Sequence, residues 1–500
     1  MTRHFQQRTF VASACIALVV SMPIYAVVIN PHGLGQVLVY PYYTVNGNNS
    51  TLLTLINSST DTKAVKVRFL EGYNGRDVLD FNLYLQPYDT WVSAVVESGD
   101  GAALYTNDAS CTVPKLPSTI VSAMAFSTNN FNSGSTQGAD GGPTGSSRTR
   151  EGHIEVIEMG TVTNDVWQTS DSLKHHGDAT DCSQVLQAWQ EGGYWRSNAQ
   201  TDIGPATGGL FGSGTIVNVP VGTVQSYNAD AITQFYAEGG VGQHSAPDAL
   251  TPNIASATSL SALVYTGNKV QSLGFKRGID AVSAVFMVES LANEYWTGGG
   301  TAARSEWVIT YPTKRFYVDP YYVGQSAQLP FEYTYGVTQS GTAVSYTDVR
   351  WVQLDREGKI AVPVCLAVGS CPSPRLLYDS QIVTFGSGGA NGMDQLYGPK
   401  TPSNVLASNL VPMNLPASSP QTGWAILDFH QGQQPTSPLR LLTDTSGSKA
   451  LIGQPVTGFW VTQLINGNAD GKGILANYTA LFRHKANARC INISDSSPCS

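Results

Sequence analysis

The segment VKVRFLEGYNGRDVLDFNLYL, residues 65–85, decides the fold of this chain. Apolar and polar residues alternate along both of its halves, so Val67 and Phe69 face the opposite side from Arg68, as in a half-buried β-strand. Asn74-Gly75 stands between the halves and favours a hairpin turn, because both residues tolerate positive φ. The segment therefore predicts two antiparallel strands joined by a tight turn.

Similar runs extend outward from this hairpin. Strand patterns over residues 36–97, and again over 118–126 and 150–160, continue a first sheet, and such patterns return after residue 255. Residues 127–147 form a Gly/Ser/Thr/Asn tract with almost nothing to bury, which predicts a mobile surface loop. We predict a mainly β fold of one or two antiparallel, immunoglobulin-like β-sandwich units with a partly helical insertion.

The insertion is expected in the middle of the chain. Within residues 161–254, DCSQVLQAWQEGGYW and NADAITQFYAEGG have helical spacing and end at a Gly pair. Residues 278–296 fit either a helix or a pair of buried strands, because periodicity alone does not distinguish them. The expected division is 1–26 signal peptide, 27–160 N-terminal sandwich, 161–254 irregular, partly helical insertion and 255–500 second β-rich domain.

The N-terminus has the layout of a secretory signal. Arg3 and Arg8 precede an apolar run over residues 10–20, and Ala26 is the small residue expected at a cleavage site. A lipid anchor at Cys15 is disfavoured, because the apolar core of the leader lies after that cysteine rather than before it. No later segment is apolar over the length of a membrane-spanning helix. We expect export to the cell surface, the extracellular space or the periplasm.

The charge of the chain argues against a nucleic-acid partner. The 28 basic and 36 acidic residues give a formal net charge of −8, which becomes −10 when the leader with its two arginines is removed. Nucleic-acid phosphates require a basic surface instead. Charged residues make up only 13% of the chain. Such a composition suits an extracellular sheet protein, and exposed sheet edges allow copies to pair as a homo-oligomer.

The cysteines suggest disulfides. One of the seven, Cys15, lies in the leader, which leaves an even number in an exported chain. Proximity along the chain favours the pairs Cys365–Cys371 and Cys490–Cys499, with Cys111–Cys182 as the remaining long-range bridge. Other connectivities remain formally open.

A set of segments spread along the chain resembles a known group of proteins. VLVYPYYTV, VKVRFLEG, LDFNLYL and EGHIEVIEMG, with EWVITYPTKRFY and NYTALFRHK further on, resemble uncharacterised exported proteins of Gram-negative bacteria. The resemblance implies a surface or periplasmic setting and brings no catalytic residues. More loosely, the first unit resembles the immunoglobulin-like modules of surface proteins, which says little about function.

Two segments concentrate residue types that bind metals. His153 and Glu155 share one face of the strand EGHIEVIEMG, and the segment KHHGDATDC contains His175, His176 and Asp178. The strand residues could bind a divalent metal, and a site shared by both segments becomes credible if the two meet in space. The competing interpretation, which we favour, is an outward polar face on the strand, with no cofactor.

Four tyrosines are candidates for ligand contacts. Tyr40 and Tyr42 lie in one Pro-Tyr-Tyr segment, and Tyr321 and Tyr322 lie in another. Tyrosine offers a large rigid surface with a polar end, which suits ligand stacking or a protein interface. The alternative is ordinary packing in the core of a β protein.

No hydrolase elbow, metalloprotease motif or phosphate-binding loop occurs in the sequence. We therefore predict an exported, non-enzymatic β protein that acts in cell-surface structure, adhesion or ligand binding, with a surface glycan or protein as partner. The alternative is a secreted hydrolase that is metal-assisted or carbohydrate-active.

Overall fold

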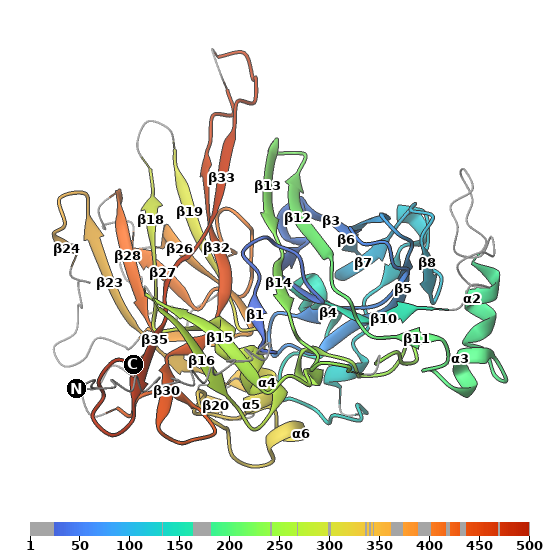
Figure 1. Cartoon of the computed structure of the whole chain (residues 1–500). Coiled ribbons are helices and arrows are strands. Elements are labelled where there is room, and N and C mark those ends of the chain that lie inside the picture. The colour runs from blue at the N-terminus through green and yellow to red at the C-terminus, as the bar shows by residue number, and fades with distance from the viewer. Residues whose placement is uncertain are drawn as a thin grey trace, which may run out of the picture.

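A computed structural model of the chain shows two β-rich halves that lie side by side (Figure 1). We call residues 25–254 the N-terminal half and residues 255–499 the C-terminal half. The prediction of a mainly β fold is confirmed. The structure describes residues 25–132, 134–163, 182–240, 243–267, 269–298, 302–335, 338–339, 342–343, 345–361, 374–388, 402–416, 421–430, 437–468 and 471–499.

Two antiparallel sheets face each other in the N-terminal half. The eight-stranded sheet has the order β1-β14-β2-β10-β4-β5-β8, with β11 also paired to β10, and the six-stranded sheet has the order β13-β12-β3-β6-β7-β9. Strands of the first sheet are β1 (Val28–Ile29), β2 (Val37–Thr44), β4 (Lys63–Glu71), β5 (Asp77–Leu85), β8 (Cys111–Val113), β10 (Glu151–Val162), β11 (Ile203–Gly204) and β14 (Asp230–Thr233). Strands of the second are β3 (Asn49–Asn57), β6 (Thr90–Ser98), β7 (Gly101–Tyr105), β9 (Met124–Ala125), β12 (Leu210–Asn218) and β13 (Thr223–Asn228).

The predicted hairpin is the centre of the eight-stranded sheet. β4 and β5 pair antiparallel with Val67 opposite Phe81, and Gly75 in the turn has φ of 68°. The apolar side chains of both strands pack against the six-stranded sheet, for example against Trp91. The hairpin predicted from the alternation of apolar and polar residues and from the Asn-Gly turn is thus confirmed.

The other face of the eight-stranded sheet is buried as well. Every residue of β4 and of β10 is buried, including Lys66 and Arg68, whose exposed fractions are 0%. Part of the covering comes from residues 244–254, because backbone carbonyls there accept hydrogen bonds from both side chains. The alternation predicted an antiparallel sheet with one solvated face. Because this polar face is buried instead, its polar and charged groups need partners within the protein.

The irregular insertion predicted for residues 161–254 is only partly correct. The first helix is present as α2 (Ser183–Ala188), followed by α3 (Tyr194–Ser197). Residues 203–233, however, supply four strands, β11 to β14, and β12 pairs with β3 over nine residue pairs. NADAITQFYAEGG was expected to be helical, but Asp230 to Ile232 pair with β2. Pairing with strands far away in the sequence overrides the local helical spacing there.

Two five-stranded sheets form the C-terminal half. Their orders are β24-β23-β28-β18-β34 and β27-β26-β19-β32-β33. Among the described residues of these two sheets, only β26 and β27 pair in parallel. The strands of the first sheet are β18 (Ser290–Trp296), β23 (Arg350–Asp355), β24 (Ile360–Ala361), β28 (Thr422–Asp428) and β34 (Lys485–Asn487). Those of the second are β19 (Arg304–Thr310), β26 (Ser380–Gly388), β27 (Met413–Pro416), β32 (Thr457–Leu464) and β33 (Tyr478–Arg483).

Shorter elements complete this half. Residues 278–296 contain both of the expected alternatives, since α4 runs over Gly278–Phe286 and β17 (Met287–Val288) and β18 follow it. The helices α5 (Arg315–Val318) and α6 (Pro320–Val323) come after β19. The remaining strands are β15 (Ser261–Thr266), β16 (Lys269–Gly274), β20 (Thr338–Gln339), β21 (Thr342–Ala343), β22 (Thr347–Asp348), β25 (Arg375–Leu376), β29 (Leu441–Thr443), β30 (Lys449–Ile452), β31 (Gln454–Pro455) and β35 (Arg489–Asn492).

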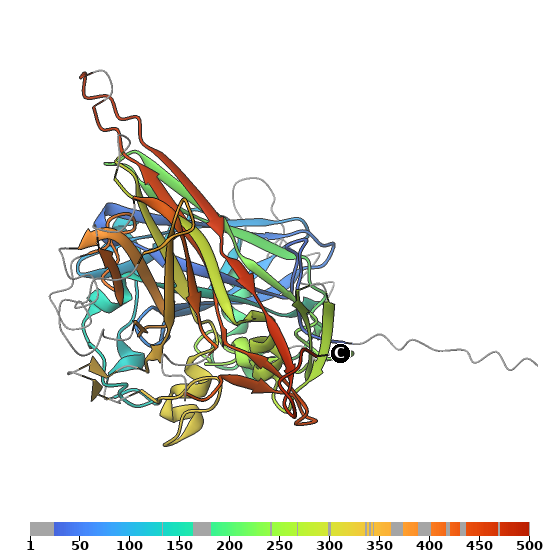
Figure 2. The same ribbon diagram turned by 90° about the vertical axis from the view of Figure 1, so that its left-hand side faces the viewer.

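The halves share their hydrophobic cores. Val308, Ile382 and Phe459 of the C-terminal half join the core between the two N-terminal sheets. Figures 1 and 2 both show the green hairpin β12–β13 running beside the red hairpin β32–β33, where Thr479 Oγ1 donates a hydrogen bond to the carbonyl of Val224. The expected domain boundary between residues 254 and 255 therefore separates two halves that pack against each other.

The tract 127–147 is anchored rather than loose among its described residues. Asp140 and Gln137 are buried, and Arg148 forms an ion pair with Asp140. Arg76 Nη1 donates to Gln137 Oε1 at 3.0 Å, and Asn74 Nδ2 donates to Asp140 Oδ2 at 3.0 Å. The prediction of a mobile loop was wrong here, because polar contacts hold a segment that has little apolar surface.

Candidate functional site

The metal candidates do not form a site in the described part of the chain. His153 and Glu155 are 1% and 0% exposed, so the outward polar face expected for their strand was also wrong. His153 Nδ1 lies 3.3 Å from Ser380 Oγ, and Glu155 Oε2 accepts a hydrogen bond from the Ile254 amide at 3.1 Å. Among the described residues no three His, Cys, Asp or Glu side chains are grouped to hold a metal ion.

The other metal candidates, His175, His176 and Asp178, lie outside the described residues. Burial lowers the pKa of His153 to about 3, so this imidazole is neutral at physiological pH. A second carboxylate of the same strand, Glu151, accepts hydrogen bonds from Tyr42 Oη at 2.7 Å and from Asn46 Nδ2 at 3.0 Å. Its role in the structure is to hold neighbouring segments together.

The tyrosine candidates divide into two kinds. Tyr40 and Tyr42 are 2% and 0% exposed and belong to the core, so they do not contact a surface ligand. Tyr322 Oη accepts a hydrogen bond from Arg315 Nη2 at 2.9 Å, and Tyr321 beside it is 50% exposed. Core packing, the alternative interpretation, holds for the first pair.

Two of the expected disulfides are present. Cys111 pairs with Cys182 and Cys490 pairs with Cys499, as proximity along the chain favoured. The first bridge ties α2 to β8 at the edge of the eight-stranded sheet. Cys365 and Cys371 lie outside the described residues.

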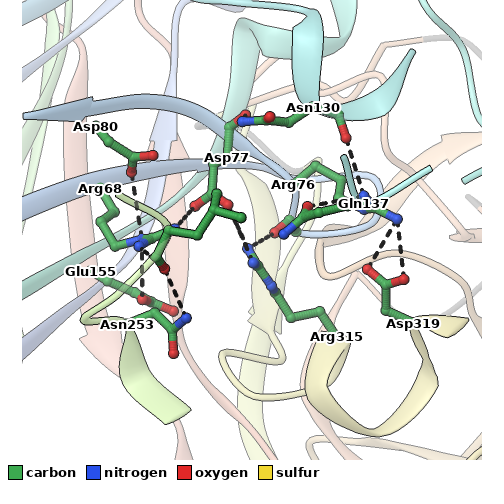
Figure 3. A network of polar contacts seen from close by, with 12 residues as sticks. Arg68, Arg76, Asp77, Asp80, Asn130, Gln137, Glu155, Asn253, Arg315 and Asp319 are labelled. Carbon is green, nitrogen blue, oxygen red and sulfur yellow. Dashed lines mark hydrogen bonds and ion pairs between the residues drawn. The ribbon is translucent and has the colours of Figure 1, made fainter. Parts of the chain in front are cut away.

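A buried ionic network connects the two halves (Figure 3). Arg68 on β4 forms an ion pair with Asp77 on β5, and Arg315 from α5 of the C-terminal half reaches the same carboxylate at 3.2 Å. In the opposite direction, Arg76 Nη2 contacts Asp319 Oδ2 at 3.0 Å. Each half thus inserts an arginine into the other.

Burial and pairing set the charges of this network. Burial alone would raise the pKa of Asp77, but the guanidinium groups of Arg315 and Arg68 outweigh it, so the pKa is lowered. Burial raises the pKa of Glu155 to about 7, although Arg68 and Arg315 oppose this effect. For Lys66, burial instead lowers the pKa, because it disfavours the charged ammonium form. These side chains are closed to solvent, and their arrangement fixes the orientation of the halves rather than offering a substrate site.

A solvent-open groove lies on the five-stranded sheet that contains β18. Its volume is about 600 Å³. Its walls come from β18, β28, the start of β34 and the residue that follows β23. Its lining includes Glu294, Trp296, Arg356, Thr422, Trp424 and Lys485. Small residues also line it, among them Ala292 and Gly423.

The two tryptophans are the distinctive feature of this groove. Trp296 and Trp424 are 41% and 39% exposed. β18 and β28 pair so that Glu294 is opposite Trp424 and Trp296 is opposite Thr422, which makes the tryptophans diagonal neighbours on one face of the sheet. Trp296 also meets Trp460 edge-to-face, with 6.0 Å between ring centroids, which helps to fix its position.

These tryptophans were not singled out from the sequence. A signal was present, because Glu294 and Trp296 occupy alternate positions of one strand and hence the same face. That alternation does not show that the face stays open, and most tryptophans of such a protein are buried, as Trp91 and Trp307 are here.

The fold and the groove define a mainly β protein of two packed halves with an aromatic surface groove. No protein-family model, curated protein or solved structure matches this chain. No helix in the described ranges is long and apolar enough to cross a membrane. The resemblance to exported proteins of Gram-negative bacteria therefore stays a prediction.

Proposed function

We propose that this chain is an exported, non-enzymatic β protein that acts in cell-surface structure or adhesion. It binds a ligand in the groove lined by Trp296 and Trp424. The observation that carries the proposal is the pair of half-exposed tryptophans. Full burial of a large apolar side chain contributes roughly 1.5 to 3 kcal/mol, and each of these rings forgoes part of that. A shared platform of two such rings is what a ligand with flat apolar faces requires.

Export is supported by the leader-like N-terminus and by the two disulfides, which are typical of oxidising compartments. The proposal includes immunoglobulin-like sandwich units, supported by the two facing antiparallel sheets of the N-terminal half and the two mainly antiparallel sheets of the C-terminal half. A setting at the cell surface, outside the cell or in the periplasm is part of the same proposal.

The groove favours binding over hydrolysis. Glycoside hydrolysis uses two carboxyl groups on either side of the scissile bond. Among the described residues that line the groove, Glu294 is the only one with a carboxylate. A metal-assisted hydrolase would need further metal ligands beside His153, and this histidine is buried in the core.

Binding to a glycan array tests the proposal, with the exported full-length chain and the variants Trp296→Ala and Trp424→Ala. Each variant should weaken binding about tenfold, as the loss of one stacking contact of about 1.4 kcal/mol implies. Tyr265→Ala is the matched control, because this tyrosine is 61% exposed on β15 and does not line the groove. Unchanged binding by both tryptophan variants, or turnover of the bound glycan, would contradict the proposal.

A further inference from the structure

The groove carries positive charge on an acidic protein. Arg356 and Lys485 line it together with a single acid, Glu294, whereas the whole chain has a formal net charge of −8. The local balance of one excess positive charge is therefore opposite in sign to that of the molecule. A local positive excess in a groove raises the local concentration of an anionic ligand.

Arg356 differs from the other arginines of this half. Arg350, Arg375 and Arg489 each form an ion pair with an acid of the protein, at 3.1, 2.6 and 3.1 Å. Within the described residues, neither Arg356 nor Lys485 has a side-chain hydrogen bond or ion pair. Both residues are exposed and line the groove.

The distance between the tryptophans suits sugar rings. Diagonal neighbours on paired antiparallel strands are about 7 to 8 Å apart, which places Trp296 and Trp424 as adjacent platforms rather than as one stacked pair. Pyranose rings have one apolar C–H face that stacks on an aromatic ring and hydroxyls around the rim. Peptides bind sheets by adding a strand at an edge or by filling apolar pockets, whereas this site is an open face with charged sides.

We propose that the groove binds an acidic oligosaccharide, in which sugar rings stack on Trp296 and Trp424 while carboxylates are bound by Arg356 on the β23 side of the groove and by Lys485 on the β34 side. A guanidinium donates two parallel hydrogen bonds to a carboxylate, and the lysine ammonium adds a second positive charge. Glu294 accepts hydrogen bonds from sugar hydroxyls. This inference rests on the proposed ligand-binding function of the groove and specifies its ligand class.

The test compares acidic oligosaccharides with neutral counterparts of equal length. The probes are tetragalacturonate, a hyaluronan tetrasaccharide and sialyllactose, each paired with its carboxyl methyl ester, and affinity is measured by calorimetry with the exported full-length chain. At least one acidic probe should bind about tenfold more tightly than its ester, because one charge-assisted contact corresponds to about that ratio. This preference should shrink as salt is added.

Variants then test which side chains cause the preference for the acidic probe over its ester. Arg356→Gln should weaken binding of the preferred acidic probe about tenfold and change binding of the ester less than about twofold. Arg350→Gln is the matched control, since Arg350 lies on the same sheet, is paired with Asp428 and does not line the groove. Trp296→Ala should weaken both the acid and the ester.

The outcomes separate the two proposals. Equal binding of acids and esters, or an acid preference that survives Arg356→Gln and Lys485→Gln, would overturn the acidic-ligand inference and leave the binding groove intact. No binding of any probe, acidic or neutral, would overturn both. Binding that is insensitive to the tryptophan variants would overturn the groove itself.

Discussion

Replacement of Arg315 by methionine tests whether the buried network holds the two halves together. Arg315 Nη1 donates to the Gly75 carbonyl at 2.7 Å, and its guanidinium contacts the Asp77 carboxylate at 3.2 Å. Methionine retains much of the volume but removes the charge and these hydrogen bonds. Asp77 would remain buried beside Arg68, its other ion-pair partner.

Breaking a buried ion pair from one side costs about 3 to 5 kcal/mol, because an incompletely compensated charge is left in the interior. Arg68 still compensates Asp77, so we expect the lower end, about 3 kcal/mol. Urea unfolding, followed by tryptophan fluorescence and by circular dichroism, measures this free energy from the shift of the transition midpoint. Arg315→Lys, which retains the charge without the planar fork, should lose an intermediate amount.

Arg350→Met is the matched control for this experiment. Its ion pair with Asp428 has a similar length of 3.1 Å, but the Arg350 side chain is 60% exposed. Such a pair contributes about 0.2 to 1 kcal/mol. If Arg315→Met and Arg350→Met shift the midpoint equally, the buried network does not stabilise the junction and the reasoning fails.

Two further predictions follow from the buried groups and the disulfides. Glu155→Gln should change the pH dependence of stability: folding raises the pKa of Glu155 from 4.5 to about 7, so its stabilising contribution is complete below about pH 4 and is lost as pH rises through 7. The variant should therefore gain about 3 kcal/mol relative to the natural chain between about pH 4 and pH 8 in urea titrations, whereas parallel pH profiles would exclude a titrating Glu155. Loss of the Cys111–Cys182 bridge by paired serine substitution should cost about 4 kcal/mol and loss of Cys490–Cys499 about 2.5 kcal/mol, because the closed loops span 71 and 9 residues. The reverse order in thermal unfolding would show that loop entropy does not govern them.

Parts of the candidate sites were predictable and others were not. Spacing along the chain favoured the pair Cys490–Cys499 because short loops close most easily, and Cys111–Cys182 followed as the remaining long-range bridge. The prediction of ligand contacts was wrong for Tyr40 and Tyr42, because a tyrosine in an apolar strand packs into the core. Its hydroxyl then bonds a nearby backbone group, as Tyr40 Oη donates to the Thr54 carbonyl. Local composition contains no information on which aromatic rings a neighbouring sheet leaves uncovered.

The sequence by itself determined the hairpin of β4 and β5, because alternation and an Asn-Gly turn are local properties. Only the tertiary structure decided that the polar face of this hairpin is buried. Arg315 and Asp77 lie 238 residues apart, and alternation states which side a residue faces but not what covers that side. The same holds for the groove, where Trp296 and Trp424 become neighbours through strand pairing and stay half-exposed because the described part of the fold leaves that face open.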